Sequence, residues 1–365
     1  MSAATLGRGT ESATPTLQQT LAVVDERLQQ VLDELEQSWQ KLAAAPDALL
    51  GADDLPALTR RAARGGKRLR PQMVHWGWVC AGAPAESHRQ VVELGAALEL
   101  LHLFALVHDD VMDHSEQRRG GPSVHAVARQ AHVERGGHGS AEDFGEHIAI
   151  LVGDLLHAEA DHLVAALPAA VRRTWRTMII ELVLGQRQDL TGTALERRDL
   201  DQALQVARLK SGSYTVQRPL QMGAELAEAS PRAVECLLRY GRHAGEAFGL
   251  RDDLLGTWGD PRDTGKSSLD DLEAGKATVL LALAVQRLDA GDRALLARLG
   301  TGELERAELE ALADRMVAAG VREQVEDLVA SQVEMACAAL DPAVLSSEGI
   351  AGLGAAAHAI AWRKS

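Results

Sequence analysis

The sequence predicts an all-α protein in which close-packed helices surround a shared core. Apolar residues recur at steps of three and four along most of the chain, which is the stripe of an amphipathic helix. Clean alternation of apolar and polar residues, which would indicate half-buried strands, is hard to find. Ala and Leu are abundant, and only 3% of the residues are aromatic. Together these observations favour a helical bundle.

The predicted elements start after a short polar tail. Residues 1–15 have little to bury and are expected to be disordered, and the first helix is expected to begin near Thr16. Helical stripes cover residues 17–35, 91–107, 149–167, 233–255, 278–288 and 321–339. Gly, Pro or Asp separate helices at 46–54, 82–84, 259–271 and 341–342. The Gly-rich, charged segment 134–146 is expected to be a surface loop.

The charge balance limits the classes of partner. The chain of 365 residues has 38 Lys and Arg against 52 Asp and Glu, a net charge of −14. This argues against a general binder of nucleic acid or anionic membranes, which require a basic surface. Apolar stretches fall short of the ~18–20 residues that span a bilayer, and the N-terminus lacks a signal-peptide pattern. A soluble cytoplasmic protein without a transmembrane segment is expected.

The three cysteines, Cys80, Cys236 and Cys337, lie far apart in the sequence and form no CxxC pair. Neither a disulfide framework nor a zinc site is therefore indicated. We expect all three to be buried, reduced thiols.

Two acidic clusters echo one another, each after an apolar helical run. In the first, Asp109 and Asp113 lie one helical turn apart, where like charges repel by about 0.2–0.5 kcal/mol unless a cation neutralises them. Asp252 and Asp253 form the second. Carboxylate oxygens suit magnesium, which completes its shell with water and phosphate oxygens. Taken alone, either cluster could be a solvated helix end, but two such clusters could face one cavity.

Basic residues that could hold phosphate accompany these clusters, because Arg offers paired donors and Lys a mobile charge. His102 lies two turns before Asp109, on nearly the same stripe, and could donate a hydrogen bond there. The basic candidates are Lys67, Arg68 and Arg70 behind two glycines, Arg118 and Arg119 after the first acidic cluster, and Lys210, Lys266 and Lys276 beside small residues. Each one alone could be a solvated surface cation.

Several motifs in this order resemble one known family. They are GGKRLRP (65–71), ELLHLFALVHDDVMD (99–113), RRGG (118–121), GDLL (153–156), GQRQD (185–189), KSGSY (210–214), FGLRDDLLG (248–256), GDPRDTGK (259–266) and DDLEAGK (270–276). Their order and spacing are similar to those of the trans-isoprenyl diphosphate synthases, also called polyprenyl synthetases. The resemblance is strong between about residues 60 and 285, and is greatest to a bacterial geranylgeranyl diphosphate synthase.

The resemblance implies a single domain over residues 16–365, of the isoprenoid synthase type, with a deep central cavity. It implies head-to-tail condensation of isopentenyl diphosphate with an allylic diphosphate, with magnesium, by a homodimer. By this resemblance, three magnesium ions would be held by Asp109, Asp113 and Asp252, supported by Asp110 and Asp253. Isopentenyl diphosphate would be bound by Lys67, Arg70, His102 and Arg119. The allylic diphosphate would be bound by Arg118, Lys210 and Lys266, with Gln186, Asp189 and Lys276 nearby.

Three positions depart from the family pattern. Gly256 stands where many members carry the last Asp of the second cluster, so magnesium affinity is expected to be weaker. Gly249 replaces a Gln that commonly precedes the second Asp pair, which removes a polar side chain. Ser211 replaces the usual Thr after Lys210 and retains the hydroxyl group.

Product length should depend on side chains below Asp109. A helical wheel places Ala105 and Leu98 on the stripe of Asp109, whereas Phe104 is rotated away. In the family, however, a bulky residue at the position of Phe104 often resembles a floor for a twenty-carbon product. We therefore expect geranylgeranyl diphosphate.

Other functions remain open at this stage. A farnesyl or longer-chain product would keep the same mechanism. A class I terpene cyclase shares the Asp-rich metal site but needs no second diphosphate pocket, so Lys67, Arg70 and Arg119 favour a synthase. A non-catalytic subunit of a heteromeric synthase is suggested only by Gly249 and Gly256.

Overall fold

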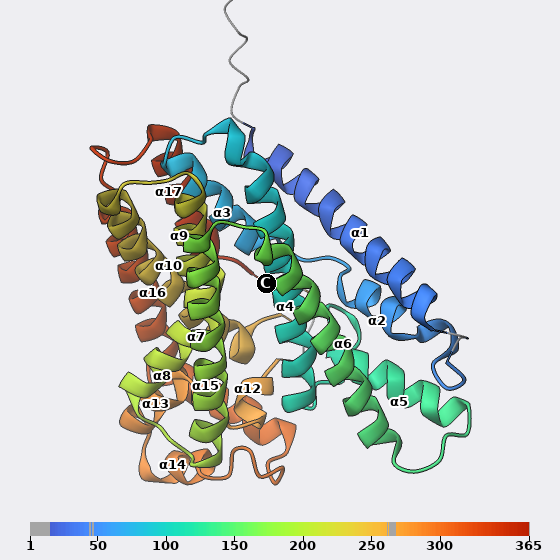
Figure 1. The fold of residues 1–365 in the computed structure, drawn as a ribbon. Coiled ribbons are helices and arrows are strands. Elements are labelled where there is room, and N and C mark those ends of the chain that lie inside the picture. The colour runs from blue at the N-terminus through green and yellow to red at the C-terminus, as the bar shows by residue number, and fades with distance from the viewer. Residues whose placement is uncertain (1–14, 44, 46, 261, 263–267, 365) are drawn as a thin grey trace, which may run out of the picture.

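The all-α prediction is confirmed in a computed structural model, which describes residues 15–43, 45, 47–260, 262 and 268–364. Figure 1 shows helices throughout, and the strands in the described residues form one hairpin of two strands, each two residues long. The elements are α1 (Leu17–Leu42), η1 (Gly51–Asp53), α2 (Leu55–Ala62), α3 (Leu69–Cys80), η2 (Ala85–Ser87), α4 (His88–Met112), β1 (Gln117–Arg118), β2 (Gly121–Pro122), α5 (Val124–Glu134), α6 (Ala141–Ala165), α7 (Ala169–Ala194), α8 (Leu200–Val206), η3 (Ala207–Gln217), α9 (Arg218–Leu226), α10 (Pro231–Trp258), α12 (Asp270–Glu273), α13 (Val279–Arg287), α14 (Ala290–Leu296), α15 (Arg306–Ala318), α16 (Val321–Ala338) and α17 (Ser347–Ala361).

The helix ends follow local capping chemistry. The Thr16 side chain accepts a hydrogen bond from the Gln19 amide, and the Gln19 side chain accepts one from the Thr16 amide. This reciprocal cap starts α1 at Leu17, which confirms the expected start. The predicted tail falls, except for Pro15, outside the described residues.

The loop predicted at residues 134–146 is shorter in the structure, because its second half belongs to α6. The Ser140 hydroxyl accepts a hydrogen bond from the Asp143 amide and caps α6, which begins at Ala141. The connection after α5 therefore covers only residues 135–140. The prediction took the charged residues 142, 143 and 146 as a sign of a loop, but they lie on the side of α6 that is not buried.

Two buried apolar clusters hold the helices together. One joins the N-terminal helices α1 to α6 with α7, and the other joins α10 with α13, α15, α16 and α17. In Figure 1, α1, α2 and α5 lie on one side of the molecule and α10, α16 and α17 on the other. Helices α4 and α7 run between these two sides, so polar residues on α4, α7 and α10 can meet where the apolar clusters adjoin.

One helix is long and apolar enough to span a bilayer, contrary to the prediction that no apolar stretch is. Residues 85–112, which include α4, contain an 18-residue window with a mean hydropathy of 1.7. Within the structure, 67% of that window is buried against other helices. The apolar character of α4 is therefore explained by its central position in the core.

The cysteines carry no disulfide among the described residues. Cys80 and Cys236 are buried, as predicted, whereas Cys337 is only partly buried. The Cys236 thiol donates a hydrogen bond of 2.8 Å to the Ala339 carbonyl oxygen. Cys80 and Cys236 belong to the apolar cluster around α10, and Cys337 packs against it.

Candidate active site

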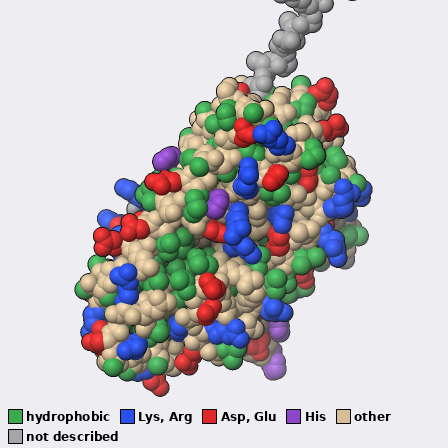
Figure 2. Space-filling model, turned by 90° about the vertical axis from the view of Figure 1, so that its left-hand side faces the viewer, with side chains coloured by type: hydrophobic (Ala, Val, Ile, Leu, Met, Phe, Trp, Pro, Cys, Tyr) green, Lys and Arg blue, Asp and Glu red, His purple; other side chains and the backbone are tan. Residues whose placement is uncertain are grey.

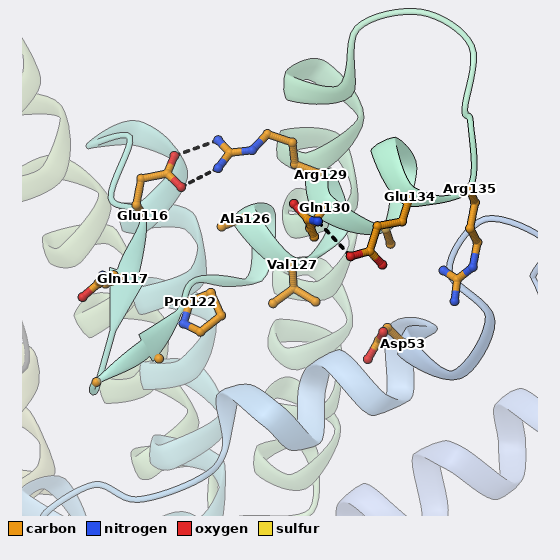
Figure 3. A pocket seen from close by; sticks show the side chains of 13 residues that line it. Asp53, Glu116, Gln117, Pro122, Ala126, Val127, Arg129, Gln130, Glu134 and Arg135 are labelled. Atoms are coloured by element: carbon orange, nitrogen blue, oxygen red, sulfur yellow. Dashed lines mark hydrogen bonds and ion pairs between the residues drawn. The ribbon is translucent and has the colours of Figure 1, made fainter.

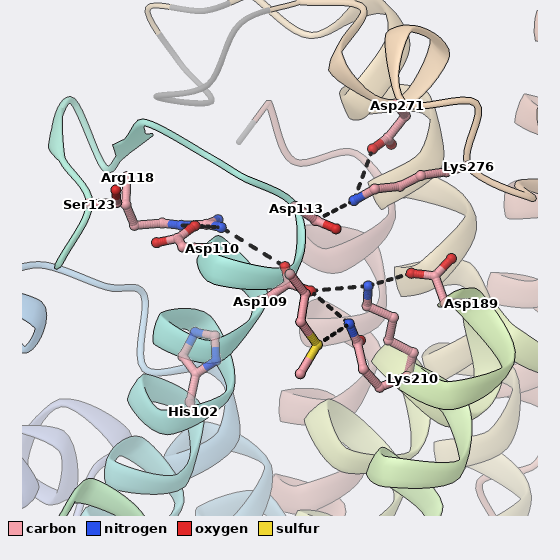
Figure 4. Close-up of polar contacts among 12 residues, drawn as sticks. His102, Asp109, Asp110, Asp113, Arg118, Ser123, Asp189, Lys210, Asp271 and Lys276 are labelled. Atoms are coloured by element: carbon pink, nitrogen blue, oxygen red, sulfur yellow. Dashed lines mark hydrogen bonds and ion pairs between the residues drawn. The ribbon is translucent and has the colours of Figure 1, made fainter. Parts of the chain in front are cut away.

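The first acidic cluster lies at the C-terminal end of α4. Asp109 and Asp110 occupy its last turn, and Asp113 is the C-cap residue, whose amide donates to the Asp109 carbonyl oxygen. The Asp109 carboxylate faces α7 and η3. It accepts a hydrogen bond of 3.2 Å from Gln186 Nε2 and lies 3.2 Å from Lys210 Nζ (Figure 4). The sequence placed these residues far apart, and the fold brings them together.

Lys210 bridges two carboxylates. Its Nζ lies 2.6 Å from Asp189 Oδ2 on α7, in addition to its contact with Asp109. Burial would lower the pKa of Lys210, but the carboxylates of Asp109 and Asp189 outweigh burial and raise it, so the ammonium group stays charged. Gly185 permits this approach, because a Cβ there would lie 2.5 Å from the Lys210 backbone nitrogen.

Lys276 makes a second bridge, from the segment after α12 back to α4. Its Nζ lies 2.6 Å from Asp113 Oδ2 and 3.6 Å from Asp271 Oδ1 (Figure 4). Burial opposes the charge on Lys276, but Asp271 and Asp113 raise its pKa. Thus Asp271, which the sequence analysis did not single out, lies at the site.

The second acidic cluster lies in α10. The Asp252 carboxylate accepts a hydrogen bond from the Arg363 guanidinium, which also lies 4.1 Å over the Phe248 ring. Asp253 Oδ2 accepts a hydrogen bond of 3.1 Å from the Val279 amide. Burial raises the pKa of Asp253, and the neighbouring Asp271 carboxylate raises it further. The proximity of Asp271 to both Asp253 and Lys276 connects the two acidic clusters.

A group of basic and aromatic side chains lies near these clusters, since the charges of Asp109 and Asp252 act on Tyr214. Arg70 Nη2 donates a hydrogen bond of 2.8 Å to Thr215 Oγ1, and the guanidinium lies 4.1 Å over the Tyr214 ring. The Tyr214 hydroxyl lies 3.1 Å from His102 Nδ1. Burial, with the charges of Arg70 and Arg119, lowers the pKa of His102, so the imidazole is neutral at pH 7. A neutral imidazole can both donate and accept a hydrogen bond.

The other predicted cations have different surroundings. Lys67 is close to Arg363 and Asp252, and its pKa is lowered first by burial and then by Arg363. Arg118 Nε donates to Asp110 Oδ1 at 2.8 Å. Arg119 donates to the carbonyl oxygens of residues 62 and 64. Ser211 is half-buried in η3 beside Lys210, and Lys266 lies outside the described residues.

Arg68 differs from its basic neighbours because it serves as a structural tie. Its Nε lies 2.6 Å from Asp25 Oδ1 on α1, and its Nη1 donates at 3.0 Å to Glu99 Oε2 on α4. Glu99 is 2% exposed. Arg68 therefore fastens the 65–68 loop, which carries Lys67, to two helices.

The departure at Gly249 has a packing explanation. A Cβ at this position would lie 3.0 Å from both the Cβ and the carbonyl oxygen of Ala207, at the start of η3. A longer side chain could not enter without moving α10 away from η3. Gly249 is therefore fitted to this close helix contact.

Sequence reasoning missed Arg363, Tyr214, Asp271 and Glu99. Three of them lie inside the motifs KSGSY, DDLEAGK and ELLH, so the motifs were a usable signal. Arg363 follows the last helix, α17, in a segment without periodicity. Arg363 lies 111 residues from Asp252 in the sequence, so no local pattern could predict their contact.

A separate surface groove lies beside the β-hairpin and α5 (Figure 3). Its lining includes Glu116, whose carboxylate pairs with Arg129, and residues of the predicted diphosphate site do not contribute. Glu116, His125 and Glu142 come within 4.8 Å of one another. Because Arg129 already pairs with both glutamates, this cluster does not indicate a metal site.

The donors that gather between α4 and α10 fit magnesium. Asp109, Asp113 and Asp252 offer carboxylate oxygens, which are hard ligands. Each now contacts a side-chain cation: Lys210, Lys276 and Arg363 respectively. The protein thus concentrates negative charge that requires positive partners. Carboxylates from two helices beside basic side chains suit a class of enzymes that bind a metal ion together with a phosphate-bearing substrate.

Comparisons with known proteins agree with this class. Residues 55–316 match the sequence model of the polyprenyl synthetase family. The chain is 36% identical over 274 residues to the (2E,6E)-farnesyl diphosphate synthase of Mycobacterium tuberculosis, covering 70% of this chain and 68% of the relative. It is 31% identical over 304 residues to the geranylfarnesyl diphosphate synthase of Aeropyrum pernix, covering 81% and 87%.

A solved structure is also similar. The geranylgeranyl pyrophosphate synthase of Corynebacterium glutamicum, complexed with isoprenyl diphosphate and magnesium, superposes with a TM-score of 0.87. Its sequence identity is 34%, and the match covers 96% of this chain and 100% of that one. The chain therefore belongs to the polyprenyl synthetase family, and it is a prenyltransferase. The resemblance inferred from the motifs is confirmed, and family membership disfavours the cyclase alternative.

Proposed function

We propose that the protein condenses isopentenyl diphosphate head-to-tail with an allylic diphosphate, and that the product is geranylgeranyl diphosphate. The observation that carries the proposal is that the two acidic clusters lie at one site: Lys276 contacts Asp113 and Asp271, and the Asp271 carboxylate lies close enough to raise the pKa of Asp253. Lys210 and Lys276 each touch the first cluster and also a carboxylate from another segment. Near them lie Arg70 and His102, whose donor groups suit a second diphosphate.

In this proposal, Asp109, Asp113 and Asp252 hold magnesium, which supplies positive charge against the allylic diphosphate. Lys210, Lys276 and Arg118 stabilise the negative charge that develops as the allylic C–O bond breaks. Lys266 is assigned to the same diphosphate from the sequence motif alone.

The second substrate is held by the neighbouring basic residues and His102. Arg70, Arg119, Lys67 and neutral His102 bind the isopentenyl diphosphate and aim its double bond at the allylic carbon. Holding both substrates in one geometry lowers the entropic part of the barrier. The double bond then forms the new C–C bond, and a proton leaves to the departing diphosphate. The helices around the site exclude water, which would otherwise quench the allylic cation.

Phe104 is proposed as the floor that limits product length. It lies on the side of α4 that faces α6, and its ring stacks on His157 with centroids 4.7 Å apart. Its ring also contacts the edge of His108 at 4.6 Å. Leu98, six residues before Phe104 in α4, is fully buried, and Ala105 is half-buried next to Phe104 in the chain. A ring held on two sides makes a firm barrier.

The function is tested by incubating the protein with magnesium, labelled isopentenyl diphosphate and, separately, dimethylallyl, geranyl or farnesyl diphosphate. Chromatography then sizes the dephosphorylated products. A twenty-carbon alcohol is expected. A single product of another length would support the condensation reaction but reject geranylgeranyl diphosphate as the product. Release of a hydrocarbon without condensation would indicate a cyclase. A protein that converts none of the substrates would indicate a non-catalytic subunit.

Phe104→Ala tests the floor separately. Removing the ring opens space between α4 and α6, so the variant should release products longer than twenty carbons in the same chromatographic assay. Phe144→Ala is the control, because Phe144 packs against His132 at the other end of α6 and should leave the length unchanged. Identical product lengths from Phe104→Ala and the unmodified protein would reject Phe104 as the floor.

The active form is proposed to be a cytoplasmic homodimer that does not bind nucleic acid. Helices α6 and α7 expose apolar side chains at Ile150, Leu151, Ile180 and Val183. A second copy could cover these side chains, as such patches often mark protein interfaces. Figure 2 shows positive and negative side chains interspersed over another face, without the large basic field that nucleic acid requires.

A further inference from the structure

The second acidic cluster lacks a carboxylate at its end. Asp252 and Gly256 are four residues apart in α10, so they lie on the same face of the helix. A carboxylate at 256 would lie one turn after Asp252, just as Asp113 lies one turn after Asp109. By sequence alone, the site is one carboxylate short.

A side chain from another segment fills that place. Asp271 is the second residue of α12, and its carboxylate lies directly against the backbone of Gly256. A Cβ built on Gly256 would lie 2.6 Å from Asp271 Cγ and would overlap Asp271 Oδ2. The space that a side chain at 256 would need is thus taken by the Asp271 carboxylate.

The surroundings of Asp271 are those of the site. Its side chain is 23% exposed, and its Oδ1 lies 3.6 Å from Lys276 Nζ, which in turn binds Asp113 at 2.6 Å. The Asp271 carboxylate is also close enough to Asp253 to raise the pKa of that group. The Asp271 carboxylate therefore stands between the two acidic clusters.

We propose that Asp271 supplies the carboxylate that Gly256 does not, and so completes the second acidic cluster for magnesium. The inference rests on the proposed magnesium-dependent function and names one residue of that same site. It also gives a role to Gly256, because any side chain there would push Asp271 away. The two positions form one unit, so substitutions at them should not be additive.

The experiment measures the melting temperature as magnesium is raised at constant ionic strength, with magnesium alone as the probe. Asp271→Ala should raise the half-saturating magnesium concentration about tenfold, the lower end of the effect of removing a supporting carboxylate. Glu273→Ala is the charge-matched control, since Glu273 is exposed in the same short helix. Its response should equal that of the unmodified protein.

A rescue variant makes the test specific. In Gly256→Asp/Asp271→Ala, the carboxylate returns from α10 into the space that Asp271 has left, and most of the lost magnesium response should return. Gly256→Ala retains every carboxylate but displaces Asp271, and should also weaken the response. Circular dichroism without magnesium checks that each variant is folded.

Two outcomes separate the inference from the function. Equal responses of Asp271→Ala and Glu273→Ala, or no recovery in the folded double variant, would overturn the inference and leave the function intact. A lack of stabilisation of the unmodified protein by magnesium would overturn the proposed magnesium dependence, and the inference with it.

Discussion

Two lysines at the acidic clusters are each shared between two carboxylates. Lys210 touches Asp109 and Asp189, and Lys276 touches Asp113 and Asp271. A shared lysine can release one carboxylate to a metal ion and still keep its charge paired. The hydrogen bonds that hold such charged groups are stronger than neutral ones. The site is therefore held in shape before any substrate arrives.

Arg363 is held in a different way, and this leads to a prediction. Its guanidinium pairs with Asp252 and covers Phe248, and it comes from the segment after α17, which can move without breaking a helix. Arg363 and magnesium should therefore compete for Asp252. Arg363→Gln should lower the half-saturating magnesium concentration about fivefold, consistent with the loss of a charged hydrogen bond.

Calorimetric titration of the folded variant with magnesium measures this effect. Lys364→Gln removes the same charge from the next residue, which is exposed, and controls for the long-range field. If the two variants bind magnesium equally well, Arg363 does not compete with the metal.

At the scale of elements, α1 is fastened to the bundle by a small polar network. The Thr20 hydroxyl lies 3.0 Å from His75 Nδ1 on α3 and 3.2 Å from His88 Nε2 on α4. Burial, and then the charge of His88, lowers the pKa of His75 to about 4. His75 is 1% exposed, so its protonation would place a charge inside the contact between these helices.

This network predicts a pH dependence of stability. The unfolded chain protonates His75 near pH 6.5 and the folded chain only near pH 4, so the free energy of unfolding falls as the pH drops through that window. Between pH 7 and pH 5 the loss from His75 alone is about 2 kcal/mol. Urea unfolding at the two pH values measures it.

The matched variants are His75→Gln and His162→Gln. His75→Gln should reduce the difference between pH 7 and pH 5 by about 2 kcal/mol, although it lowers stability at pH 7. His88 and His102, whose pKa values are also lowered by burial, contribute to the remainder. His162 is exposed on α6, and its replacement should leave the difference unchanged. An unchanged pH dependence in His75→Gln would show that other groups cause it.

At the scale of the whole molecule, α6 and α7 expose several large apolar side chains on neighbouring turns. Ile180 and Val183 are 50% and 57% exposed, and Ile150 and Leu151 are 40% and 48% exposed. In Figure 1, α6 and α7 are drawn in front of α4 and α10. Burying such side chains gains roughly 25 cal/mol for each Å² removed from water.

Ile180→Glu/Val183→Glu should therefore convert a dimer into a monomer, because two charges on each copy would have to be buried without partners. Size-exclusion chromatography with light scattering gives the mass. Val317→Glu is the control, since Val317 is also exposed but lies on α15. A protein that is already a monomer before substitution would reject the proposed dimer.

Local information in the sequence determined most of the helices and the family. Apolar periodicity predicted α1, α4, α6, α10, α13 and α16, because a helix must place its buried residues on one face. The motifs identified the family and named Asp109, Asp113, Asp252 and Lys210, since their residue types and order are properties of the chain itself. Neither the loop at 134–146 nor the central burial of α4 was read correctly, because both depend on which face packs against a neighbour.

Only the tertiary structure decided how these residues are partnered. It brought Arg363 to Asp252, Asp271 to Gly256 and Arg68 to Glu99, across separations that no local period records. The physical reason is that charges separated in sequence find partners through helix packing, which depends on the shape of the whole core. The sequence by itself thus determined the helices, the family and the polar residues of the proposed site, and the packed fold decided which carboxylate meets which cation.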